Sequence, residues 1–170
     1  WLLIALTSPE GDHLMSTRTQ RQRGSGRPPP VVEPESVYRL VGERVPLVGS
    51  MQRGPGGHYA VPARVPGMGN GTLRYVLSGV MKPDAFLELV KRQKVRTDWV
   101  ISIFDARGTR VARSRSHEQS LGTRASPSLQ KLLQASGEGW DLTQTIEGDP
   151  VYTAFSRSPE TGWAVAVGIP

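Results

Sequence analysis

The sequence predicts an α+β fold in which one small plan of antiparallel strands and helices occurs twice. First, residues 1–18 and residues 99–115 both have the pattern of a β-hairpin, an apolar run followed by a turn and a second extended run. Second, residues 59–64 and 152–157 share a Tyr, four intervening residues and an Arg, and each leads through a turn into a further strand. The copies are offset by 99 − 1 = 98 and 152 − 59 = 93 residues, so their register agrees to within a loop insertion.

The bulk composition is compatible with two small modules. The chain has 170 residues, of which 37% are hydrophobic, and modules of roughly 80 residues are each marginal when alone. No run of about 18 apolar residues is present, so we expect no membrane-spanning helix in this segment. Because the first residue is Trp1 rather than Met, we expect a longer parent protein.

The net charge of +6 raises the possibility of an anionic partner such as nucleic acid or a membrane surface. Most of the charge is scattered, which favours an ordinary solvated surface, and the exception is an arginine cluster within residues 18–27. The sequence contains no cysteine, which excludes disulfides and thiolate metal sites.

In the first half, residues 2–6 and 13–18 form the predicted hairpin, with a turn at 9–12. A long loop rich in Arg, Gly and Pro follows at 19–34, and its alternative role is to bind a proline-recognition module. Ser36 is the expected N-cap of a short helix over 37–41. Residues 45–48 then form a strand, unless the helix simply breaks at Gly42.

The glycine-rich stretch 67–71 superficially resembles a phosphate-binding loop. It lacks the Lys-Ser/Thr pair of a P-loop and the strand–helix setting of a dinucleotide site. It separates two extended runs instead, so we predict a hairpin whose turn is Asn70-Gly71 and whose second strand includes residues 73–77.

The second half has a more regular pattern. Pro83 suits the first turn of a helix that packs on the second sheet, and Gly108 supplies the positive φ of a hairpin turn. The predicted order is helix, strand, strand, helix, strand, strand, strand, over residues 83–94, 100–104, 110–114, 127–135, 140–146, 151–156 and 163–169. Five antiparallel strands with a helical insertion after the second are a PAS-like arrangement. The first half fits the same plan with a looser middle.

Several of these segments resemble a known family. Residues 99–114 (WVISIFDARGTRVARS), 121–123 (LGT) and 156–170 (SRSPETGWAVAVGIP) are similar to double Cache domains, the extracytoplasmic sensors of bacterial histidine kinases, chemoreceptors and diguanylate cyclases. The resemblance covers about residues 73–170 and is weak over 1–71. It implies two PAS-like modules, each an antiparallel sheet of about five strands with flanking helices. Residues 1–80 would be the membrane-distal module without the family's long N-terminal helix, and residues 81–170 the membrane-proximal module.

The resemblance also implies a function. The chain would be the ligand-sensing input domain of a membrane-anchored receptor, with a sensor histidine kinase as the first choice. The parent would lie in the cell inner membrane between flanking spans, as a homodimer, with this domain periplasmic or extracellular. Its ligand would be a small organic acid or amino acid, and nucleic acid is not expected as a partner. Two alternatives stay open: a cytoplasmic PAS-like interaction module, and a basic nucleic-acid-binding module that uses the arginine-rich loop.

No catalytic, metal or cofactor site is predicted. His13, His58 and His117 are far apart in sequence and lack the carboxylate spacing of a metalloprotease or hydrolase motif. We therefore expect a non-catalytic domain with no cofactor.

A ligand site in a PAS-like module lies between the sheet and the helix or loops that cross it. An Arg on the sheet face near aromatic rings can hold a ligand carboxylate with two hydrogen bonds. Strand alternation places Ile101, Ile103 and Asp105 on one face, and groups Val111, Arg113 and Arg115 on one face of the next strand. The candidates are Asp105, Arg113 and Tyr152 in the second module and Tyr59, Arg74 and Tyr75 in the first. The alternatives are surface ion pairs for the arginines and core rings for the tyrosines.

Overall fold

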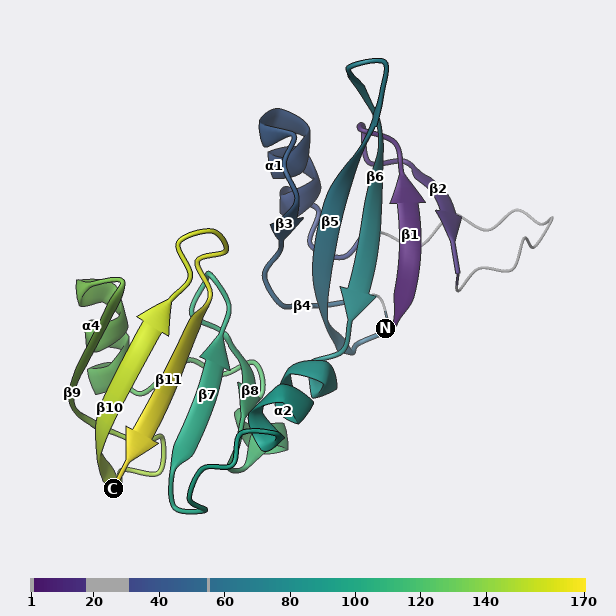
Figure 1. The fold of residues 1–170 in the computed structure, drawn as a ribbon. Coiled ribbons are helices and arrows are strands. Elements are labelled where there is room, and N and C mark those ends of the chain that lie inside the picture. The colour runs from purple at the N-terminus through teal and green to yellow at the C-terminus, as the bar shows by residue number, and fades with distance from the viewer. Residues whose placement is uncertain (1, 18–30, 55) are drawn as a thin grey trace. The chain divides into compact units, whose positions relative to one another are not determined.

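The computed structural model describes residues 2–17, 31–54 and 56–170. The chain divides into two compact units, Trp1–Lys82 and Pro83–Pro170, and each is described by itself (Figure 1). The arginine cluster and most of the predicted loop at 19–34 lie outside the described residues, as does Trp1.

The first unit is built on an antiparallel sheet whose described strands run in the order β2-β1-β6-β5-β3, with β4 paired to β5 (Figure 1). Helix α1 (Glu35–Glu43) covers one face. The strands are β1 (Leu3–Thr7), β2 (His13–Ser16), β3 (Leu47–Val48), β4 (Gln52–Arg53), β5 (Tyr59–Gly69) and β6 (Thr72–Met81).

The glycine-rich stretch is the tip of a hairpin, as predicted. Strands β5 and β6 pair up to Gly69 and Thr72, which leaves Asn70 and Gly71 as the two-residue turn. Both turn residues have positive φ, 52° for Asn70 and 74° for Gly71. This is the conformation that a two-residue hairpin turn requires, and Asn-Gly adopts it at least cost.

The predicted N-cap of the first helix is wrong. Pro34 holds the N-cap position of α1 with φ −63°, and Ser36 lies buried inside the first turn. The hydroxyl of Ser36 donates to the Glu33 carbonyl and accepts a hydrogen bond from Arg64 Nε at 2.6 Å. A distant arginine therefore uses the side chain that would otherwise cap the helix.

Arg64 is the largest fully buried side chain of the first unit, and it lies on the α1 side of the sheet. Only 1% of it is exposed, and its guanidinium donates to Ser36, Ser78 and the carbonyls of Val32 and Glu33. Burial lowers the pKa of Arg64 to about 10, while the charge of Glu33 acts in the opposite direction. Apolar contacts among Val37, Leu40 and Val76 complete this side of the sheet.

The second unit is a five-stranded antiparallel sheet in the order β8-β7-β11-β10-β9. Two helices flank it: α2 contacts β7 and β8, and α4 contacts β9 (Figure 1). The helices are α2 (Asp84–Lys91), α3 (His117–Ser120) and α4 (Pro127–Ala135), and the strands are β7 (Val100–Phe104), β8 (Arg110–Arg113), β9 (Glu138–Gln144), β10 (Pro150–Arg157) and β11 (Ala164–Ile169).

Each face of the second sheet has its own apolar cluster. On the α4 face, Phe104 and Phe155 contact Leu129 and Leu133 of α4. On the other face, Ile101 and Ala112 contact Val90 of α2. This two-sided covering explains why Val100–Phe104 is a nearly continuous apolar run rather than an alternating one.

The two sheets share one plan. In each, the strand order begins with a hairpin (β2-β1 and β8-β7) and continues with the last strand of the unit, its hairpin partner and an edge strand. The predicted α+β fold of two PAS-like modules is confirmed. Strand β4 and helix α3 were not predicted, because each is too short to show a period. None of the described helices has the length and apolar character needed to cross a membrane.

Candidate functional site

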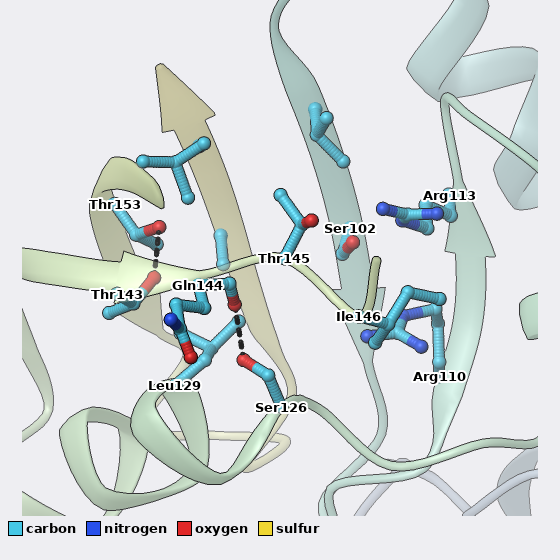
Figure 2. Close-up of a pocket in the computed structure, with 14 residues that line it drawn as sticks. Ser102, Arg110, Arg113, Ser126, Leu129, Thr143, Gln144, Thr145, Ile146 and Thr153 are labelled. Atoms are coloured by element: carbon cyan, nitrogen blue, oxygen red, sulfur yellow. Dashed lines mark hydrogen bonds between the residues drawn. The ribbon is translucent and has the colours of Figure 1, made fainter. Parts of the chain in front are cut away.

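A small cavity lies in the second unit where α4 begins over the sheet (Figure 2). Its free space is about 30 Å³, enough for roughly two water molecules. Polar and apolar side chains from β7, β8, β9, β10, β11 and α4 meet there. The lining residues are Val100, Ser102, Arg110, Arg113, Ser126, Leu129, Thr143, Gln144, Thr145, Ile146, Val151, Thr153, Ala166 and Gly168.

A β-bulge in β8 brings two arginines to this cavity. Residues three apart in a regular strand point to opposite faces, so Arg110 and Arg113 would be separated by the sheet. Instead the pairing shifts between Ile103↔Ala112 and Phe104↔Arg110, so that β8 contains one extra residue, Val111. Both arginines consequently line the cavity (Figure 2), whereas alternation alone predicted Val111 beside Arg113.

Arg113 is held by a carboxylate from another loop. Its Nη1 and Nη2 donate to Glu147 Oε1 and Oε2 at 2.6 and 2.7 Å, and Nη1 also donates to the Arg115 carbonyl at 3.0 Å. The Arg113 side chain is 2% exposed and that of Glu147 is 37% exposed. These hydrogen bonds, chiefly those from Arg113, hold the pKa of Glu147 far below its usual value of 4.5.

Arg110 has weaker partners. Its guanidinium lies over the Phe104 ring, with Cζ 5.1 Å from the ring centroid, and Nη1 donates to Thr123 Oγ1. Only 2% of Arg110 is exposed, and its Nε has no hydrogen-bond acceptor among the described residues. Burial and the nearby charge of Arg113 lower its pKa to about 10 while the charge of Glu147 acts in the opposite direction, so the group stays a cation at neutral pH.

The N-terminus of α4 adds further positive potential. Ser126 and Leu129 line the cavity, and Pro127 occupies the first turn. No side chain caps this end in the described structure, since the Ser126 hydroxyl donates to the Gln144 carbonyl instead. Free amides at a helix N-terminus and the helix dipole both favour anions. The chemistry of the cavity is therefore that of a small anion site.

The turn between β9 and β10, residues 145–149, forms one border of the cavity. Thr145 donates its backbone N–H to the Asp149 carbonyl at 2.9 Å, and its hydroxyl accepts from the amides of Glu147 and Asp149, each at 3.2 Å. Ile146 of this turn lines the cavity. Arg115 Nη2 also contacts Glu147 and Asp149, both at 3.0 Å.

A second and larger cavity, of about 160 Å³, lies at the opposite end of α4. Asp105 lines it and is fully buried, and its carboxylate accepts from the amides of Arg107 and Thr109 at 2.9 and 2.8 Å. These bonds shape the β7–β8 turn. Asp105 and Arg113, predicted as partners in one site, thus line different cavities.

The other predicted site residues lie elsewhere. Tyr152 is 58% exposed and alternates with Val151 and Thr153, which line the cavity, so it is on the opposite face of the sheet. In the first unit, Arg53 Cζ lies 4.5 Å from the Tyr59 ring centroid. Arg74 and Tyr75 are exposed on β6 close to the β5–β6 turn.

Of the six predicted residues, only Arg113 lines the small cavity. Arg110 and Glu147 were missed. The available signal was the Arg-rich strand 110–115, but the effect of the bulge cannot be read from it. Among the described residues, no three or more His, Cys, Asp or Glu side chains are grouped so as to hold a metal ion.

No family model matches the chain, and no curated protein matches it in sequence. Solved structures do match. They include an extracellular ligand-binding receptor from Desulfohalobium retbaense (TM-score 0.76, 13% identity, 99% of this chain and 30% of that chain). The extracellular domain of rpHK1S-Z16, described as a histidine kinase, matches with TM-score 0.67 and 19% identity over 98% of this chain and 69% of that chain.

A third match is the ligand-binding domain of the Pseudomonas aeruginosa amino acid chemoreceptor PctB in complex with L-Arg. Its TM-score is 0.64 and its identity 12%, over 99% of this chain and 70% of that chain. The chain thus spans less than a third of the first of these proteins and about 70% of the other two. The matches show that the chain has the fold of extracellular ligand-binding domains.

Proposed function

We propose that this chain is the extracytoplasmic ligand-sensing input domain of a membrane-anchored receptor, with a sensor histidine kinase as the first choice of parent. The fold is shared with extracellular domains of a receptor, a protein described as a histidine kinase and a chemoreceptor. Under this proposal the parent is a homodimer in the inner membrane. The domain itself is non-catalytic and faces the periplasm or the exterior, with the first unit distal to the membrane.

The observation that carries a binding role is the environment of Arg110. This cation is almost fully buried, contacts a ring and a hydroxyl, and has an Nε–H without an acceptor in the described residues. Among the described residues the nearby opposite charge is Glu147, which pairs directly with Arg113, so a bound anion would compensate Arg110 more closely. Together with Arg113 and the α4 N-terminus, it favours a small carboxylate, an organic acid or an amino acid, as the ligand.

Signalling in this proposal follows from a shift between two states. A ligand changes the equilibrium only by its difference in affinity for the two states. The cavity has room for about two waters, so in this proposal a carboxylate ligand favours a state in which part of the lining, here the β9–β10 turn, has moved. That movement would be the first step in transmitting ligand binding to the membrane-facing end of the domain.

The test is a thermal-shift screen of small organic acids and amino acids, followed by calorimetric titration of each hit. We expect a hit to raise the Tm of the wild type and of the control variant Arg96→Met, whose side chain is exposed. The Arg110→Met variant should lose the shift, and Arg110→Lys, which keeps the charge, should retain part of it. A hit that acts equally on Arg110→Met, or a screen without a hit, would overturn the proposed site.

A further inference from the structure

Glu147 already occupies the place on Arg113 that a ligand carboxylate would take. Both of its oxygens accept from the guanidinium, at 2.6 and 2.7 Å, in the two-pronged geometry by which Arg recognises free carboxylates. Arg113 itself is 2% exposed and belongs to the lining of the cavity. In this structure the protein's own carboxylate thus occupies the arginine site.

Glu147 belongs to the β9–β10 turn, which borders the cavity. Glu147 follows Ile146, which lines the cavity, and three hydrogen bonds around Thr145 and Asp149 fold the turn as a unit. Glu147 and Ile146 are neighbours in this one turn, so a displacement of the turn that takes Glu147 from Arg113 also takes Ile146 from the cavity lining.

We propose that the β9–β10 turn is a latch, in which Glu147 is an internal competitor that an incoming carboxylate ligand displaces from Arg113 as the turn opens. This inference rests on the proposed sensing function for the identity of the ligand, but not for the exchange itself. It names the ligand class more narrowly, because the group that replaces Glu147 must be a planar anion with two acceptor oxygens.

Exchange of one carboxylate for another solves an energetic problem of the site. Removing the carboxylate from the buried Arg113 outright would leave its charge uncompensated, which is unfavourable. If the ligand takes the place of Glu147, Arg113 stays paired in both states. Arg115, which contacts Glu147 and Asp149 at 3.0 Å, keeps the released turn near the site through Asp149. Opening then depends on the small difference in free energy between the Arg113–Glu147 pair and the pair of Arg113 with the ligand carboxylate, as a two-state sensor requires.

Acetate tests the latch without the natural ligand. In Glu147→Ala the Arg113 guanidinium loses its carboxylate, so we expect the Tm to fall and sodium acetate to restore it in a saturable manner, beyond the effect of sodium chloride at equal ionic strength. Glu138→Ala, which removes another exposed acid of the same strand region, is the matched control and should resemble the wild type. The double variant Glu147→Ala/Arg113→Met should show no acetate rescue.

Equal acetate effects in the wild type and Glu147→Ala, or rescue that persists without Arg113, would refute the latch. Glu147→Gln, which preserves shape, provides a second test should Glu147→Ala not fold. With a ligand from the screen, Glu147→Gln should bind at least roughly tenfold more tightly than the wild type, since the competitor is weakened. Unchanged affinity would reject the latch and leave the sensing function intact, whereas acetate rescue without any screening hit would support the latch and count against that function.

Discussion

Arg64 should be the main polar contributor to the stability of the first unit. Arg64→Met removes four donor contacts, to Ser36, Ser78 and two carbonyls, and leaves the buried carboxylate of Glu33 without this nearby cation. Removing one partner from a buried charged network costs about 3–5 kcal/mol. The pKa of Arg64, lowered to about 10, shows that burying the cation is itself costly, so we expect the lower end, about 3 kcal/mol.

Hydrogen exchange read by mass spectrometry can localise this effect. A loss of about 3 kcal/mol corresponds to roughly a hundredfold faster exchange where amides open with the unit. We expect this increase in β5 and β6, with β10 and β11 of the second unit as internal reference. Arg74→Met, which removes an exposed arginine of β6, should leave exchange unchanged.

The double variant Arg64→Met/Glu33→Gln tests the physical reason. Part of the lost protection should return, because the amide removes the buried negative charge that faced Arg64. Protection of β5 and β6 within about threefold of the wild type in a folded Arg64→Met protein would show that the buried network contributes little.

Three further predictions concern single sites. Because Arg113 lowers the pKa of Glu147, the pair stabilises the fold above pH 4.5 and loses this effect as the pH falls further. The difference in Tm between the wild type and Glu147→Gln should therefore be largest near neutral pH and shrink in acid. A difference that does not change with pH would contradict this. Gly71→Ala, at φ 74°, should lower the free energy of unfolding by about 1 kcal/mol in urea titrations, because a side chain disfavours this conformation. Gly42→Ala on the open surface of α1 should raise it by about the same amount. If both variants changed the free energy of unfolding in the same direction, the backbone argument would be refuted. Phe104→Ala should cost about 3–5 kcal/mol by the same titrations, and a loss below about 1 kcal/mol would mean that this core refills.

The parts of the fold that sequence predicted well are those set by local chemistry. Helix α4 and strand β7 have the predicted bounds, since an apolar pattern and flanking turn residues define them within a few positions. The turn at Asn70-Gly71 follows from the ease with which these two residues take positive φ. The cap at Ser36 was missed because its hydroxyl serves Arg64, which is 28 residues away.

The site was harder to predict than the fold because it depends on pairings between distant segments. Arg113 could be chosen as an arginine on a sheet face. Its partner Glu147 is 34 residues away in a turn that looks merely polar. Arg110 was assigned no role, because regular alternation directs it away from Arg113 and the bulge at Val111 reverses this. Tyr152 follows regular alternation and lies on the outer face.

The two copies of the plan use their buried arginines in different ways. In the first, the Arg64 guanidinium donates to neighbouring carbonyl and hydroxyl groups and so links the segments that carry them. In the second, Arg110 lines the small cavity, and its Nε–H has no acceptor among the described residues. Two units with one plan thus differ in what a buried arginine does: in the first the described protein groups accept from every guanidinium nitrogen, and in the second one nitrogen has no acceptor among the described residues.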